Sequence, residues 1–168
     1  AQLRVLDRGE PGEESGLLGS EAFAERPTIP LAKLATVLNL DVVNLYGRTS
    51  DIAGLGADQS SLGGVFLLAA KAEGLRVVTD SLALLRGSFF RSDHFPFVRH
   101  GVPAISVEPG STFDGRPAGW GEEQQLEYQA KRYHSPQDEI LSWFSWDGAM
   151  QQIRVSLRTA LAVADAVA

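Results

Sequence analysis

Two adjacent carboxylates, Glu13 and Glu14, are the first residues along the chain whose types and spacing could do chemistry. They follow Gly12 and precede a glycine-punctuated helix start, Ser-Gly-Leu-Leu-Gly-Ser at 15–20. Two like charges side by side repel, so burying them is costly unless a cation or a proton lies between them. Acidic residues also favour the first turn of a helix. The pair alone therefore fits either a solvated acidic turn or a site that holds a cation or moves a proton.

Three later stretches place further acidic and imidazole groups at the ends of expected strands or loops. They are Asn-Leu-Asp at 39–41, Ser-Asp-His-Phe-Pro-Phe at 92–97 and Tyr-His-Ser-Pro-Gln-Asp at 133–138. Together with the acidic pair they supply Asp41, Asp93 and His134, and carboxylate with imidazole is a ligand set that suits zinc. Asp41 taken alone fits a loop-capping carboxylate as well as a metal ligand. The chain has no cysteine and no Gly-x-Ser-x-Gly turn, so acyl-enzyme chemistry has no obvious nucleophile.

Composition limits the classes of function. A chain of 168 residues fits one domain, expected over 1–168, and it is long enough to bury a core. With 44% hydrophobic and 21% charged residues it is typical of a globular protein. The net charge is −6 and basic residues do not cluster, which argues against nucleic acid or anionic lipid as a partner. We also expect no membrane association, since no apolar run reaches the length of a membrane span.

Hydrophobic periodicity predicts alternating strands and helices, which is typical of an α/β fold. Strands are expected at 3–7, 35–43, 51–56, 75–79 and 102–107, and helices at 17–25, 60–73, 122–132 and 147–167, with a helical turn at 97–100. Gly63 and Gly64 weaken the helix at 60–73 near its start. The order strand, turn, acidic pair is the one expected where a site is built on the strand ends of an α/β sheet.

The closing helix carries an apolar stripe that we expect to pack in the core rather than to bind a cofactor. Its members recur at helical spacing: Met150, Ile153, Leu157, Leu161, Ala164 and Val167.

Five motifs together resemble the two-zinc aminopeptidases, metallopeptidase family twenty-eight. They are Glu-Glu-x-Gly-Leu-Leu-Gly-Ser at 13–20, Asn-Leu-Asp at 39–41, Ser-Asp-His-x-Pro-Phe at 92–97, Gly-Val-Pro-Ala at 101–104 and Tyr-His-x-Pro-x-Asp at 133–138. Each motif alone would be weak, but the five occur in the family's order over nearly the whole chain. The resemblance implies an open, mostly parallel or mixed sheet with helices on both faces, and a zinc-dependent exopeptidase.

The resemblance also implies roles for single residues. Glu13 would be the general base that takes a proton from a metal-bound water, and Glu14 and His134 would ligate one zinc. Asp41 would ligate the second zinc of a two-metal site.

Two further sets of residues are expected near the site. Asp93 and His94 belong to a motif that supports the site from the second shell in the family, and neither is expected to be a ligand. A structural role is also open for His94, as it is for His100, because a lone histidine near an apolar stretch is commonly just hydrogen-bonded. A second set of aromatic residues fits an apolar substrate pocket and core packing equally well: Phe113, Trp120 and Tyr128.

The sequence departs from the family before Glu13. The family places two further ligands there, a histidine in a His-x-Asp motif and an aspartate that bridges both metals, and neither is present. Asp7 does not match the bridging position, and Glu10 remains an alternative base because the segment before Glu13 is longer than the family's turn. We therefore expect a domain truncated at its N-terminus, with a depleted zinc site and little peptidase activity.

A truncated sheet would expose an unpaired edge, so self-association through that edge is expected. The expected partner is a peptide substrate, and the family is often exported. Two alternatives stay open: a metal-free binding or scaffold homologue of the peptidase fold, and a glutaminyl-cyclase-like acyltransferase. Retention of the acidic pair, Asp41 and His134 together favours the enzyme over the scaffold.

Overall fold

The structure is a computed structural model of the 168-residue chain, and it describes residues 12–166. The strand expected at 3–7, together with Asp7 and Glu10, lies outside the described residues.

Four strands of the described part form one mixed sheet, in the order β1-β4-β2-β3. Their bounds are Val37–Asn39 for β1, Asp51–Leu55 for β2, Arg76–Val78 for β3 and Ala104–Pro109 for β4. β1 runs parallel to β4 and β2 parallel to β3, whereas the central pair β2 and β4 is antiparallel. The expected mixed sheet is confirmed. The strand expected at 35–43 is shorter than predicted, so Asp41 lies beyond its end and is exposed.

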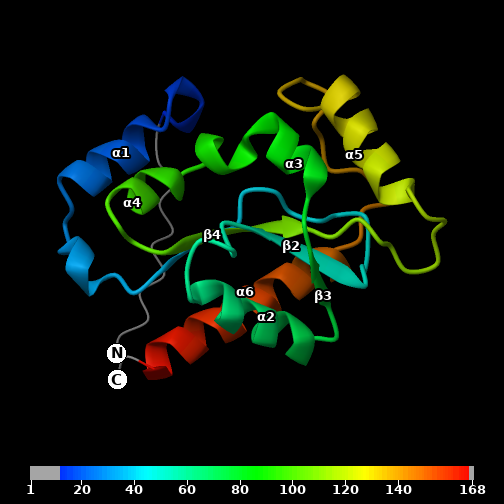
Figure 1. The fold of residues 1–168 in the computed structure, drawn as a ribbon. Coiled ribbons are helices and arrows are strands. Elements are labelled where there is room, and N and C mark those ends of the chain that lie inside the picture. Colours follow the sequence, from blue (N-terminus) through cyan, green and yellow to red (C-terminus); the bar gives the residue numbers. More distant parts are fainter. Residues whose placement is uncertain (1–11, 167–168) are drawn as a thin grey trace.

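Helices cover both faces of the sheet, as expected (Figure 1). On one face lie α2 (Leu62–Ala72) and α6 (Asp147–Ala166), which contact each other along much of their length. On the other side of the sheet lie four helices, α1 (Leu18–Glu25), α3 (Ser81–Arg86), α4 (Phe95–Arg99) and α5 (Trp120–Lys131). Short 3-10 turns occur at η1 (Glu13–Ser15), η2 (Leu31–Lys33) and η3 (Ser88–Arg91). Among residues 12–166 no helix is both long enough and apolar enough to cross a bilayer.

The main core fills the space between the sheet and the helix pair α2 and α6. Phe66 from α2 and Val155 from α6 meet Ile52, Ile105 and other fully buried strand residues there. The glycine at position 63, which weakens the start of α2, has a packing reason: a Cβ there would lie 1.7 Å from the carbonyl oxygen of Ala57.

The prediction that the stripe on the closing helix packs in the core is wrong. Four of its members are between 42% and 49% exposed: Met150, Ile153, Leu157 and Leu161. The buried face of α6 carries Val155 and four polar residues, Gln151, Gln152, Ser156 and Thr159.

Hydrogen bonding explains why polar side chains occupy the buried face. The Gln151 side chain accepts from the backbone N–H of Thr49 and donates to its carbonyl, each at 2.9 Å. Gln152 accepts from the N–H of Asn44 at 2.8 Å and donates to the carbonyls of Val42 and Val107 at 2.9 and 3.0 Å. Backbone groups buried without a partner are costly, so α6 turns its amides toward the segment that follows β1 and toward β4.

Two single substitutions on α6 test this orientation. We expect Val155→Ala to lower the free energy of unfolding by about 2 kcal/mol, because it opens a cavity in the core, and Leu157→Ala to cost less than about 1 kcal/mol. Urea unfolding followed by circular dichroism measures both. A larger loss for Leu157→Ala would mean that the apolar stripe is the buried one.

Candidate functional site

The turn η1 displays Glu13 and Glu14 just before α1. Gly12 and Gly16, with φ of 86° and 102°, bracket the turn in the left-handed region, and the N–H of Gly16 donates to the carbonyl of Glu13 at 3.0 Å. Leu17 also has a positive φ, 62°, which is uncommon for a residue with a side chain. The tight turn keeps both carboxylates at the beginning of the helix.

His134 reaches the acidic turn from the other end of the chain. Its Nε2 lies 2.8 Å from Oε1 of Glu14, and both side chains are at least half exposed. His134 itself is left-handed, with φ of 55°, and its ring stacks on Tyr133 with 3.7 Å between centroids. The turn after α5 therefore presents the imidazole to Glu14.

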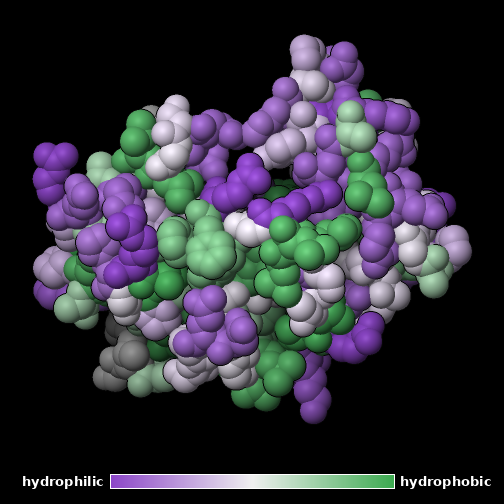
Figure 2. All heavy atoms as spheres, turned by 45° about the horizontal axis from the view of Figure 1, so that its top comes forward, coloured by the Kyte–Doolittle hydropathy of each residue, from purple (hydrophilic) through white to green (hydrophobic). Residues whose placement is uncertain are grey.

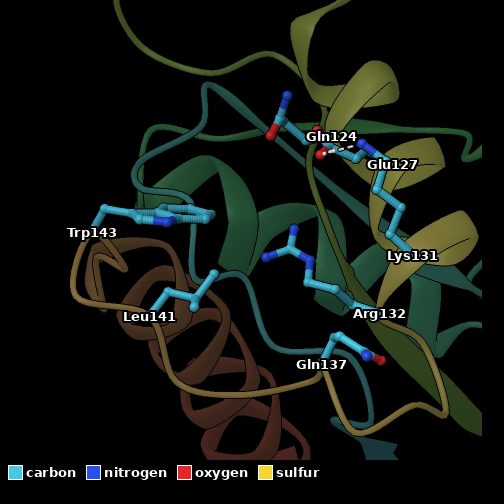
Figure 3. A pocket seen from close by; sticks show the side chains of 7 residues that line it. All are labelled: Gln124, Glu127, Lys131, Arg132, Gln137, Leu141 and Trp143. Carbon is cyan, nitrogen blue, oxygen red and sulfur yellow. Dashed lines mark hydrogen bonds and ion pairs between the residues drawn. The ribbon is translucent and has the colours of Figure 1, made fainter.

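An arginine held among aromatic rings fixes that turn. Arg132 donates to the hydroxyl of Tyr46 at 2.7 Å, and its guanidinium lies 5.5 to 6.0 Å from the ring centroids of Tyr46, Tyr128 and Trp143. Figure 3 shows Arg132 extending from the end of α5 toward the loop that carries Trp143, in a pocket of 400 Å³. Cation–π contacts of this kind restrict the residue just before the pair 133–134.

Serine hydroxyls hold the two other candidate carboxylates. Ser20 of α1 donates to Asp93 at 2.7 Å, and Ser92 donates to Asp41 at 3.2 Å. Both serines are buried, so each aspartate is tied to the body of the protein. Sequence analysis did not single out either serine, although each occurs in one of the family motifs.

Glu13 lies within the field of its acidic neighbours. Burial, followed by the charges of Glu14, Asp41 and Asp93, raises the pKa of Glu13 above its usual value. The structure thus brings together five of the candidate residues: Glu13, Glu14, Asp41, Asp93 and His134. Figure 2 shows a hollow with hydrophilic residues around its mouth on the side of the molecule where η1 and α5 lie.

The side chain of His94 is buried, unlike the exposed imidazole of His134. The His94 ring is fully buried beside Phe89, with 4.8 Å between ring centroids, and neither ring nitrogen has a hydrogen-bond partner among residues 12–166. Burial lowers the pKa of His94 to about 4, so the ring is neutral near pH 7. The other lone histidine, His100, is exposed at the end of α4.

Sequence analysis missed one buried acid, Glu108 on β4. Asn39 donates to the hydroxyl of Ser106 at 3.3 Å, and this hydroxyl donates to Glu108 at 2.7 Å. Burial raises the pKa of Glu108 to about 7, with smaller contributions from the charges of Asp41 and Asp80. The position of this glutamate directly after the apolar run 102–107 could have indicated that it is buried.

A hollow beside Glu13 is lined by residues of η1, α1, η3 and α4. Its lining does not include the aromatic residues Phe113, Trp120 and Tyr128. The ring centroids of Phe113 and Trp120 lie 5.0 Å apart, and both rings contact the ring of Tyr46. Tyr128 donates to Asp138 at 2.8 Å. These contacts favour the packing alternative, and a role in substrate binding stays a prediction.

The donor types at the site fit zinc in part. Glu14 and His134 offer a carboxylate oxygen and an imidazole nitrogen within one coordination sphere, whereas a catalytic zinc has three protein ligands. Within residues 12–166 no three His, Asp or Glu side chains are grouped so that they could hold a metal. The described residues therefore supply part of a zinc ligand set.

Comparison with known proteins identifies the family. The family model described as Peptidase family M28 matches residues 11–160, most of the chain. The chain belongs to peptidase family M28. This confirms the resemblance to the family. No curated protein matches the chain at the level of sequence.

Two solved structures share the fold of this M28 domain. An aminopeptidase from Aneurinibacillus sp. strain AM-1 superposes with a TM-score of 0.53 at 18% identity, over 89% of this chain and 30% of its own. The glutaminyl cyclase of Porphyromonas gingivalis gives a TM-score of 0.50 at 15% identity, over 89% of this chain and 47% of its own. The chain thus spans less than half the length of either protein.

The two buried titratable groups have opposite effects on stability. Between about pH 4 and 6.5 the unfolded chain binds a proton at His94 that the folded chain lacks, so this group makes stability rise with pH. Between about pH 4.5 and 7 the folded chain holds a proton at Glu108 that the unfolded chain has lost, so stability falls with pH.

We expect Glu108→Gln to remove the contribution of Glu108, so that the rise of stability with pH caused by His94 becomes visible. The free energy of unfolding of this variant, minus that of the wild type, should rise by roughly 1.4 kcal/mol per pH unit between pH 4.5 and 6.5. Urea unfolding across this range measures it, with the exposed Glu122→Gln as the control. Parallel curves for Glu108→Gln and the wild type would contradict the raised pKa.

Proposed function

We propose that this M28 domain serves a zinc-dependent exopeptidase of the aminopeptidase type, in which Glu13 is the general base for hydrolysis of a peptide bond. The observation that carries the proposal is the 2.8 Å contact between Glu14 and His134. It joins a carboxylate and an imidazole, the donors that zinc prefers, directly beside Glu13.

Each residue has a separate part in this proposal. Glu14 and His134 would hold one zinc and Asp41 the second, with further ligands from outside residues 12–166. When bound, zinc supplies Lewis acidity that polarises a scissile carbonyl and activates water. Asp93, which accepts a hydrogen bond from Ser20, adds negative charge near Glu13.

Glu13 would move the proton of the reaction. It lies next to Glu14 in η1, and its carboxylate would take the proton of a water molecule bound near the Glu14–His134 pair. Glu13 accepts a proton as the water attacks the carbonyl and returns it to the leaving amine, which restores the carboxylate. The tight turn limits the freedom of this carboxylate between the two steps.

Zinc binding to metal-stripped protein tests the ligand assignment. We expect His134→Asn to weaken zinc binding by about 100-fold or more, beyond the 10–100-fold cost of losing an outer-shell partner, and Glu14→Gln to act alike. Competition with a chromophoric chelator measures the affinity. The matched control is His100→Asn, because His100 is an exposed histidine away from the acidic pair. Equal affinity for His134→Asn and the wild type would refute the proposed ligand.

A substitution at Glu13 separates the base from the ligands. The chain is expected to have little peptidase activity, and we expect Glu13→Gln to lower this remaining rate of aminoacyl-amide hydrolysis by up to 10²–10⁴-fold while zinc affinity changes only a few-fold. The control is Glu25→Gln, an exposed glutamate on α1. Hydrolysis that survives Glu13→Gln would remove Glu13 from the mechanism.

The same assays decide between the alternatives. Release of pyroglutamate from a peptide with N-terminal glutamine, without hydrolysis of aminoacyl amides, would replace the peptidase with an acyltransferase. Wild-type protein that binds no zinc and hydrolyses no peptide would fit an incomplete site as well as a binding or scaffold role, because the described residues supply only part of a zinc ligand set.

A further inference from the structure

His94 is the one imidazole that is buried in the described part of the chain. Its ring packs beside Phe89, which belongs to a small apolar cluster with Leu55 and Ala83. Neither of its ring nitrogens has a hydrogen-bond partner among residues 12–166. A proton on this ring would create a buried charge without a partner, which is far more costly than the neutral ring.

The charged groups around His94 do not offset such a proton. Burial is the cause of its lowered pKa, and no neighbouring charge contributes to the shift. Its own surroundings in the chain include Asp93, Arg99 and His100. The neighbouring elements carry further charged groups: Glu21 and Glu25 on α1, Asp51 on β2, Asp80 and Arg86 at α3, Arg91 on η3 and Glu108 on β4.

His94 lies in the middle of a short segment, residues 88–99, which comprises η3 and α4 and is called here the η3–α4 segment. Glycines with positive φ bracket it, Gly87 at 65° and Gly101 at 81°, and each is a natural hinge. Helix α4 has five residues, too few to stay helical in isolation. The segment packs on the cluster around Phe89, on the side of the sheet away from α2 and α6 (Figure 1). Its opening therefore costs less free energy than unfolding of the main core.

Two hydrogen bonds join this segment to the rest of the acidic site. Ser92 donates to Asp41 at 3.2 Å, and Asp93 accepts from Ser20 at 2.7 Å. Ser92 and Asp93 directly precede His94 in the chain. A movement that brings the His94 ring into water therefore breaks both bonds.

We propose that the η3–α4 segment is a pH-dependent switch of the acidic site: a proton on His94 opens the segment and breaks both hydrogen bonds while the main core stays folded. In the open form the ring has its ordinary pKa of 6.5, whereas in the closed form its pKa is about 4. Opening is therefore least favoured above pH 6.5 and becomes easier as the pH falls toward 4. The inference rests on the proposed function only in taking these carboxylates as a functional site.

Hydrogen exchange of the metal-free protein, measured by mass spectrometry and corrected for the intrinsic rates at each pH, tests this. We expect fragments covering 88–101 to lose protection by about 50-fold between pH 7 and pH 4.5, the ratio given by the two pKa values of His94. Fragments of α1 should follow, because Ser20 loses its partner Asp93. Fragments of α6 exchange through global unfolding, in which Glu108 offsets His94, and should keep their protection.

Two variants assign the effect to the buried ring. His94→Phe should remove the pH dependence of fragments covering 88–101, whereas His100→Asn, at the exposed histidine just after α4, should retain it. A pH dependence that survives His94→Phe would overturn the proposal. So would constant protection of 88–101 in the wild type, an equal loss in α6, or a constant α1, and these wild-type results decide even if His94→Phe does not fold. Loss of zinc binding alone would refute the proposed metal ligands and leave this result standing.

Discussion

The hydrogen bonds of the Gln152 side chain hold α6 against the two segments that carry Asp41 and Glu108. This side chain accepts one backbone hydrogen bond and donates two, and so joins α6, the strand β4 and the segment that follows β1. That segment contains Asp41, and β4 carries Glu108. A buried amide with all these bonds made fixes geometry more strictly than an apolar side chain would, because any shift leaves a backbone group unsatisfied.

The site itself is a concentration of negative charge that the fold tolerates by several means. Asp41 and Asp93 each accept a hydrogen bond from a serine hydroxyl, Glu14 contacts the imidazole of His134, and burial raises the pKa of Glu108 to about 7. Burial, followed by the charges of Glu14, Asp41 and Asp93, raises the pKa of Glu13. The distribution is what a site would have if a positive ligand or substrate group were to bind there.

Much of this could be predicted from sequence, and the exceptions share a cause. The strand β2 and the helices α1, α2 and α6 were found close to their expected places because long apolar patterns are informative. The orientation of α6 was not predicted, because periodicity identifies an apolar face but not what lies opposite it. The short helix α3 was also missed. Motifs pointed to Glu13, Glu14 and His134 as candidates, whereas the contact of Ser20 with Asp93 and the burial of Glu108 depend on how distant segments pack.

The separation of the site residues along the chain has a kinetic consequence. Ser20 meets Asp93 across 73 positions and Ser92 meets Asp41 across 51, while Glu14 must find His134 near the other end of the chain. Contacts between such distant positions form only after the intervening chain has lost most of its freedom. The pairing of β1 with β4 closes a comparable loop, with 67 positions between Asn39 and Ser106. The acidic site and the sheet therefore depend on the same long-range contacts, and partly folded forms that lack β1–β4 pairing would also lack the assembled site.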